Sequence, residues 1–322
     1  EDTMSIFTSS KILGFENDEI LGPTGAVAIP EFNTRFTRQM LVDTQPQDFN
    51  TLVRLSGFSH GTDVWLGNAR ELILSKQATV LQTVGCRDDI MLYLISMGVD
   101  AKTSFKIMEA VRKGKVKKGG FQDGWEEAMR EHEVPDWYIE SLSKIGYLFP
   151  KAHAVAYVMM AFRIAWFKVH QPLAFYAAFF SIRAKAFDAE ICTAGLDAVK
   201  QKIHEIENNK DATAVEQDLL VTLEVCYEFY LRGFHFDPIN IYESDATRFK
   251  VVENGLLPPF TSVHGLGESA ALAAVEQRKG KQFLSIEEFS ECCSKLSKTH
   301  IEQLKALGAF AGLPETSQLT LF

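Results

Sequence analysis

The chain has 322 residues, 46% of them hydrophobic, so it can bury the core of one to three domains. Its net charge of -9 argues against a protein that simply coats nucleic acid, although a local basic cluster can override the total. The five cysteines form no C-x-x-C pair and no histidines cluster, which argues against a zinc site or a disulfide framework and favours a reducing, cytoplasmic compartment. These cysteines are Cys86, Cys192, Cys226, Cys292 and Cys293.

The chain starts at Glu1 without a signal peptide, and we expect it to be part of a longer polypeptide. Its longest apolar run, 154–162, is roughly half of what a transmembrane helix needs, so no membrane partner is expected.

The elements predicted along the chain are mainly helices. Residues 1–45 contain several glycines and prolines and are expected to be irregular. Apolar residues at helical spacing, acidic first turns and helix-stopping glycines or prolines then predict a series of helices. They lie within 49–61, 87–98, 104–115, 125–134 and 135–149.

Two strongly apolar helices are expected next, over 151–171 and 172–185. A helix that is hydrophobic all round is a central, buried one. Pro172 suits the first turn of the second helix. Two amphipathic helices are expected over 195–233.

The composition changes after residue 233. Asn254 and Gly255 stand between β-forming residues and predict a hairpin. A glycine-rich turn and several short helices follow. The sequence therefore predicts a mainly α fold, with a large helical domain, then a small mixed module and a tail.

A glycine-rich turn precedes an alanine-rich helix in residues 263–278. Gly265, Leu266 and Gly267 stand where glycine allows positive φ and a close approach of ligand to backbone, and amides at a helix start bind phosphate. This spacing matches a helix-hairpin-helix, which grips duplex DNA without reading its sequence. The alternative is an ordinary turn with a helix cap. Residues 295–310 look like a second, degenerate copy, which favours DNA binding because such hairpins usually occur in pairs.

A basic segment spans residues 112–118, where five of seven side chains are positive. One interpretation is salt-dependent contact with a phosphate backbone, and the other is a solvated loop. The residues are Arg112, Lys113, Lys115, Lys117 and Lys118.

Three further segments carry residues suited to an anion. Lys151 and His153 lie in the first turn of a predicted helix, where amides favour anions, and Tyr157 shares a face with His153. Residues 56–68 form a polar stretch, and Arg87 offers a fork for phosphate. The alternative for 151–163 is a core helix with a solvent-exposed start.

Asp88 and Asp89 could suggest a metal site, but adjacent helical residues do not face each other. First-turn acids that complement the helix dipole account for them better. We find no other convincing pair of metal-binding carboxylates in the sequence.

The chain ends in Gln318-Leu319-Thr320-Leu321-Phe322, a polar anchor followed by apolar side chains. An apolar cluster at a terminus needs a partner or a fold to cover it. The segment has the form of a linear motif that fills a partner's pocket, although chance matches to five residues are common.

Several long stretches together resemble one family, the C-terminal part of PolC, which is the C-family replicative DNA polymerase of low-GC Gram-positive bacteria. The stretches at 151–157 and 237–251 also resemble the more distant alpha subunits of other bacteria. The resemblance covers nearly the whole chain, in residues 29–41, 55–69, 84–95, 105–115, 134–184 and 257–267.

The resemblance implies four parts: the end of the palm (1–45), fingers that bind nucleotide and template (46–190), a helical extension with the duplex-binding hairpins (191–312) and a clamp-binding tail (313–322). The tail is similar to a sliding-clamp pentapeptide with Thr320 in place of Ser or Asp. The family's catalytic aspartates lie upstream of residue 1, so no catalytic residue, no metal site and no polymerase activity are expected in this chain alone. Mg²⁺ is expected for the intact polymerase.

The resemblance also implies which residues bind. The nucleotide pocket, where guanine-mimicking inhibitors of the family act, would be bordered by Ser59, His60, Arg87, Lys151 and His153, with Tyr157 on the base side. The hairpin and the basic segment would contact primer-template DNA, although the basic segment is longer than the family's. Gln318, Leu319, Leu321 and Phe322 would bind the beta sliding clamp.

Three functions remain in competition. The first is the part of a replicative DNA polymerase that binds incoming dNTP, DNA and the clamp. The second is a non-enzymatic DNA-binding adaptor that recruits the clamp. The third, a generic helical structural domain, fits poorly with the density of motifs.

Overall fold

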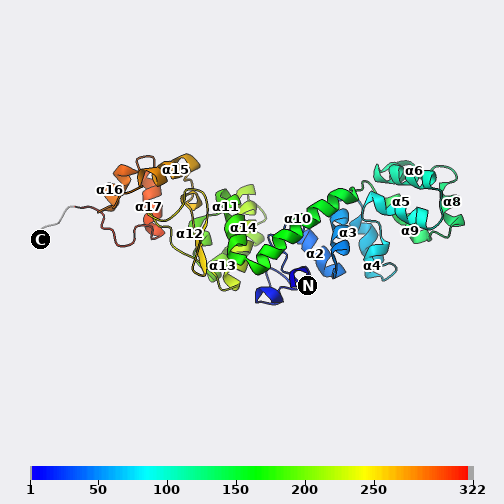
Figure 1. Cartoon of the computed structure of the whole chain (residues 1–322), viewed down its shortest axis with the longest axis horizontal. Coiled ribbons are helices and arrows are strands. Elements are labelled where there is room, and N and C mark those ends of the chain that lie inside the picture. The colour runs from blue at the N-terminus through cyan, green and yellow to red at the C-terminus, as the bar shows by residue number, and fades with distance from the viewer. Residues whose placement is uncertain (1, 318–322) are drawn as a thin grey trace. The chain divides into compact units, whose positions relative to one another are not determined.

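The computed structural model describes residues 2–317, and the chain divides into two compact units, 1–166 and 167–322. Helices build most of both units, and within 2–317 the only sheet is small and three-stranded (Figure 1). The predicted mainly α fold is therefore confirmed. The predicted boundaries near residues 45, 190 and 312 stay predictions.

Unit 1 is helical, and the boundary with unit 2 falls inside its last helix, α10. Short loops connect its helices, several of which start at side-chain caps such as Asp48 for α3 and Asp100 for α6. The helices are α1 (Asp2–Ser5), α2 (Arg35–Thr44), α3 (Phe49–His60), α4 (Arg70–Leu74), α5 (Arg87–Ser96), α6 (Ala101–Arg112), α7 (Lys115–Gly119), α8 (Trp125–Glu131), α9 (Asp136–Lys144) and α10 (Lys151–His170).

The first 45 residues are less irregular than the sequence predicts, because α2 is a regular helix of 10 residues. The glycines and prolines of this region end at Pro30. Thr34 then caps the helix by accepting a hydrogen bond from the Thr37 amide. The prediction was wrong here because it extended the influence of the helix breakers past the last of them.

The prediction that α10 is buried on all sides was also wrong. Only a narrow stripe of it is fully buried, formed by Ala154, Val158, Ala161, Ala165 and Lys168 at helical spacing. Tyr157 and Met160, on other sides of the helix, are about half exposed. Apolar composition therefore overstated the burial of this helix.

By length and composition, α10 is the one helix among residues 2–317 that could cross a membrane. The sequence alone had suggested no such segment. One helix of this kind is weak evidence, since core helices pass the same test.

Unit 2 combines helices with the small sheet. Strand β3 pairs in parallel with β1 and antiparallel with β2, and the β2–β3 turn places Asn254 at positive φ, which confirms the predicted hairpin. The elements are α11 (Pro172–Ile182), α12 (Ala189–Cys192), α13 (Leu196–Asn208), α14 (Ala214–Leu231), β1 (His235–Phe236), β2 (Lys250–Val252), β3 (Gly255–Leu257), α15 (Glu268–Gln277), α16 (Ile286–Cys292) and α17 (Lys298–Ala306).

A buried polar network lies beside the aromatic core of unit 2. The Lys168 ammonium lies 2.7 Å from the Glu228 carboxylate, and both side chains are wholly buried. Tyr176 donates its hydroxyl to the same carboxylate at 2.6 Å, and burial raises the pKa of this tyrosine. Arg232 donates to the Lys168 carbonyl at 2.9 Å. The network therefore ties the end of α10 to α11 and α14.

Candidate functional site

Three segments that are far apart in the sequence meet in unit 1. Cys86 forms a parallel β-bridge with Phe149, and the Arg87 amide donates to the Phe149 carbonyl at 3.2 Å. Thr62, just after α3, forms an antiparallel bridge with Tyr147. The end of α3, the start of α5 and the start of α10 are thereby held together.

A close contact between two glycines makes this convergence possible. A Cβ atom on Gly57 of α3 would lie 2.4 Å from the Gly85 carbonyl oxygen and 2.8 Å from the Cys86 sulfur. Only glycine lets α3 lie so near the segment that leads into α5. Burial, with the nearby Asp89 carboxylate, raises the pKa of the Cys86 thiol to about 12, so this cysteine packs as a neutral side chain.

Aromatic rings gather at the meeting point. The His60 imidazole stacks on Phe149 with ring centres 4.6 Å apart, and Tyr157 lies nearly parallel to His60 at 6.3 Å. The His153 ring meets Phe149 edge-on at 5.9 Å. Tyr157 is half exposed. Three of the predicted nucleotide-binding residues therefore surround one phenylalanine, Phe149, which was not among the residues chosen from the sequence.

Glu31 reaches this cluster from the N-terminal region. Its carboxylate accepts the Ser56 hydroxyl at 2.9 Å and lies 3.6 Å from Nδ1 of His60. Glu31 holds a left-handed backbone, with φ of 72°, which is uncommon for a residue with a side chain. Such backbone strain tends to occur at functional sites. Nothing in the sequence pattern marked Glu31, since its contacts depend on the folded arrangement.

The two aspartates of α5 act at two different helix starts. Asp89 accepts the Cys86 amide at 2.7 Å and pairs with Arg54 at 2.7 Å, as a capping acid of α5. Asp88 accepts the Lys151 amide at 2.9 Å and so caps α10. Asp89 therefore serves the start of its own helix, as expected, whereas Asp88 serves the start of another helix, which the sequence did not indicate. A phosphate at the start of α10 would have to share that amide with Asp88.

The remaining predicted nucleotide-binding groups lie at the edge of the cluster. The Lys151 ammonium lies 3.4 Å from Asp89, and within residues 2–317 the Arg87 guanidinium has no ion-pair partner. Ser59 donates to the Ser56 carbonyl at 3.0 Å. The backbones of Arg87 and Lys151 therefore adjoin Phe149, through a hydrogen bond and through the chain, and the assignment of all six residues to nucleotide binding stays a prediction.

The basic segment is partly neutralised by acids. Arg112 and Lys113 both pair with Glu109, whose pKa falls to about 2 because these two side chains donate hydrogen bonds to it. Lys117 pairs with Asp63 at 2.5 Å. Lys115 begins α7, so part of this segment is helix where a loop was an alternative. Its DNA contact stays a prediction.

The two proposed hairpins of unit 2 share one local structure. In the first, the Leu266 amide donates to the Val263 carbonyl at 3.1 Å and Gly267 precedes α15. In the second, the Leu296 amide donates to the Cys293 carbonyl at 2.9 Å and a serine precedes α17. Both leucines are buried. Gly265 holds φ of 75°, as a tight turn before the helix requires.

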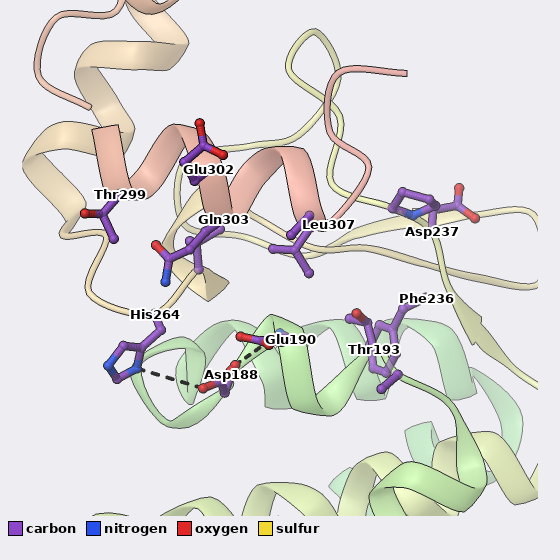
Figure 2. Close-up of a pocket in the computed structure, with 14 residues that line it drawn as sticks. Asp188, Glu190, Thr193, Phe236, Asp237, His264, Thr299, Glu302, Gln303 and Leu307 are labelled. Atoms are coloured by element: carbon purple, nitrogen blue, oxygen red, sulfur yellow. Dashed lines mark hydrogen bonds and ion pairs between the residues drawn. The ribbon is translucent and has the colours of Figure 1, made fainter. Parts of the chain in front are cut away.

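A cavity of about 600 Å³ adjoins the first hairpin but does not suit phosphate (Figure 2). Carboxylates line it from several elements, and His264 lies 3.9 Å from one of them, on Asp188. Because these charges repel anions, the cavity is not part of the candidate nucleic-acid surface. The acidic lining residues are Asp188, Glu190, Asp237 and Glu302.

Two expectations concern the clamp-binding tail and metal binding. The predicted clamp-binding residues Gln318, Leu319, Leu321 and Phe322 lie outside the described residues. Within 2–317, no group of three or more metal-binding side chains comes together.

Comparison with known proteins defines the class of both units. Residues 1–133 match the bacterial DNA polymerase III alpha subunit finger domain. Residues 233–319 match a helix-hairpin-helix motif. The fingers and the hairpins expected from the sequence are therefore confirmed as domain types.

The full-length matches are more specific. The chain is 52% identical to a DNA polymerase III PolC-type of Caldanaerobacter subterraneus subsp. tengcongensis over 321 residues, which is 99% of this chain. It is 49% identical, over its whole length, to the DNA polymerase III PolC-type of Halalkalibacterium halodurans and to that of Bacillus cereus. It spans 23% of the first of these proteins and 22% of the other two. Over its whole length the chain is therefore similar to a segment of PolC-type DNA polymerase III proteins that makes up about a fifth of their length.

Proposed function

We propose that this chain is the part of a replicative DNA polymerase that binds the incoming nucleotide, the primer-template duplex and the sliding clamp. The observation that carries the proposal is the convergence in unit 1. His60, Arg87 and Lys151 come from separate segments, yet the two β-bridges and the stacked rings bring them to one place. Aromatic faces beside cations suit a nucleotide, which presents a flat base and a chain of phosphates.

The chemistry of strand extension belongs to another part of the polymerase in this proposal. Phosphoryl transfer requires carboxylates that hold two metal ions, and we propose that a palm domain outside this chain supplies them together with Mg²⁺. This chain alone would bind without catalysing. Its family and the reducing compartment suggested by its cysteines support a cytoplasmic location.

Kinetics of a full-length polymerase carrying this segment test the nucleotide site. Arg87→Ala and Lys151→Ala should each raise the KM for dNTP by about 10-fold or more, since each removes a charge-assisted bond to phosphate worth about 1.5–3 kcal/mol. Lys144→Ala is the matched control, because Lys144 pairs with Glu140 on the surface of α9. An unchanged KM in both test variants would remove these residues from the site.

Binding of primer-template DNA is assigned to the first hairpin. The amides of Gly265 and Gly267 form no hydrogen bond within residues 2–317 and are available to phosphate. Gly267 has an extended backbone that other residues adopt, and its Cβ would meet nothing within 4 Å, so Gly267→Ala keeps the fold and crowds only the ligand. Duplex affinity that survives this change would refute the assignment.

Clamp binding is assigned to the tail, on the sequence pattern alone. Calorimetric titration of the chain with purified sliding clamp, beside a chain lacking Gln318 to Phe322, tests it. Micromolar binding that the truncation abolishes supports the assignment. Equal binding, or none by either form, contradicts it.

The second candidate is a non-enzymatic adaptor that binds DNA and recruits the clamp. Unit 2 and the tail alone would suffice for it. Binding of dNTP or of a guanine-mimicking inhibitor to unit 1 would exclude this candidate, because an adaptor has no use for a nucleotide site.

A further inference from the structure

A histidine connects the two hairpins of unit 2. His300 lies in the first turn of α17, and its Nε2 atom is 3.2 Å from the carbonyl oxygen of Gly265 in the first hairpin. Its other ring nitrogen, Nδ1, is 3.2 Å from the amide nitrogen of Ser297, the residue that caps α17. One imidazole therefore bonds to both hairpins.

The hydrogen-bond chemistry fixes the form of this ring. A backbone amide can only donate, so Nδ1 of His300 must accept from Ser297 and carries no proton. The proton of the neutral ring is then on Nε2, which donates to the Gly265 carbonyl. Ser297 in turn accepts the His300 amide at 3.2 Å, which completes a reciprocal cap of the kind usually made with Glu or Gln.

This arrangement makes the hairpins unequal. Gly267 and Ser297 occupy the same place in their hairpins, with closely similar backbone angles of φ -75°, ψ 157° and φ -71°, ψ 163°. The Gly267 amide is available to a ligand, whereas the Ser297 amide already donates to His300. In the second hairpin, the amide that corresponds to the Gly267 amide, with which the first can bind phosphate, is therefore already occupied by His300.

The bond to Gly265 restrains the first hairpin where it turns. The peptide that joins Gly265 to Leu266 is held at both ends, since its carbonyl accepts from His300 and its amide donates to Val263. With this peptide held, the two peptides on either side of it, which carry the amides of Gly265 and Gly267, have less freedom to turn. A preorganised pair of donors binds an anion more tightly than a mobile pair.

We infer that His300 is a positioning residue that braces the first hairpin, and that the second hairpin serves as this brace instead of as an equal DNA-binding hairpin. The inference rests on the proposed DNA-binding role of the first hairpin. The second hairpin lacks both glycines. Its role as a brace explains why it keeps the turn although its Ser297 amide is not available to a ligand.

Duplex binding by the whole chain tests the brace, by fluorescence anisotropy at several salt concentrations. His300→Ala should weaken binding about fivefold, the effect of one net hydrogen bond, with an unchanged salt dependence because no phosphate contact is lost. His300→Gln should bind within about twofold of the unchanged chain, since its amide can donate to Gly265 and accept from Ser297. Thr299→Ala, at the exposed neighbouring position, is the control.

The outcomes separate the two proposals. If His300→Ala binds as the unchanged chain does, or if His300→Gln is as weak as His300→Ala, the brace is refuted. If the salt slope falls by about one with His300→Ala, the ring contacts phosphate itself, which also refutes it. Duplex binding by neither the unchanged chain nor any variant would refute the DNA-binding role of this module.

A nuclear magnetic resonance measurement tests the brace without DNA. Long-range proton–nitrogen correlation should show the His300 ring protonated on Nε2 only, with His300→Gln used to assign the signal. A ring protonated on Nδ1 would overturn the inference. Where His300→Ala folds, the Leu266 amide should exchange with solvent several-fold faster than in the unchanged chain.

Discussion

Lys168→Met removes the positive member of a wholly buried ion pair in unit 2. The substitution shortens the side chain by only one heavy atom and leaves the Glu228 carboxylate in the core with the Tyr176 hydroxyl as a hydrogen-bond donor. Removing one partner of a buried pair costs about 3–5 kcal/mol, because the remaining charge has lost its compensation. We expect a loss of this size in the free energy of unfolding of unit 2.

Urea unfolding followed by far-UV circular dichroism, with hydrogen exchange of α14 peptides, measures the loss. Glu228→Gln combined with Lys168→Met should recover about 2 kcal/mol relative to the single change, because the unpaired charge is gone while Tyr176 keeps its acceptor. Lys202→Met is the matched control, since Lys202 pairs with Glu205 on the surface of α13 and should cost less than about 1 kcal/mol. A loss below about 1 kcal/mol for Lys168→Met would refute the reasoning.

Three further predictions concern unit 1. Gly57→Ala should lower the free energy of unfolding by about 1–3 kcal/mol in a thermal melt, because the new methyl meets the Gly85 carbonyl; an unchanged melt would show that the segments can separate freely. Glu31→Gln should raise the KM for dNTP in the full-length polymerase about fivefold with little change in the melting temperature, by removing the charge beside His60; a fall in stability with an unchanged KM would make its role structural. Glu109 has a folded pKa of about 2, below its unfolded value, so the stability that it contributes is present above about pH 4.5 and is lost as the pH falls toward 2. Glu109→Gln should therefore make the free energy of unfolding depend less on pH in that window. An unchanged pH profile would contradict the pairing.

The sequence predicts those parts of the fold that depend on local chemistry. The β2–β3 hairpin follows from Asn254, which tolerates the positive φ of the tight turn, while Gly255 beside it is already the first residue of β3. The glycine-rich turn before α15 is predicted for the same reason. The burial of α10 is not, because composition does not tell which apolar side chains find a partner, and here only one stripe of the helix is fully buried.

The candidate site likewise contains residues that the sequence predicts and residues that it does not. Basic residues such as Arg87 and Lys151 can be chosen from the sequence because cations beside a helix start suit phosphate. Phe149 and Glu31 could not be chosen, since each acts through a neighbour distant in the sequence that only folding brings near. The role of His300 could not be predicted either. A histidine in place of the usual Glu or Gln of a helix cap does not indicate that its other ring nitrogen bonds to the Gly265 carbonyl.

The bridge between Cys86 and Phe149 has a consequence for how this part of the chain can evolve. All of α5 to α9 lies between these two residues, and their pairing closes that stretch into a loop whose ends meet (Figure 1). A segment whose ends are adjacent can be lengthened, shortened or exchanged without moving what lies beyond them. The outer part of this stretch, between α7 and α9, can therefore vary in length from one relative to another, while the rings and cations at its base keep their places.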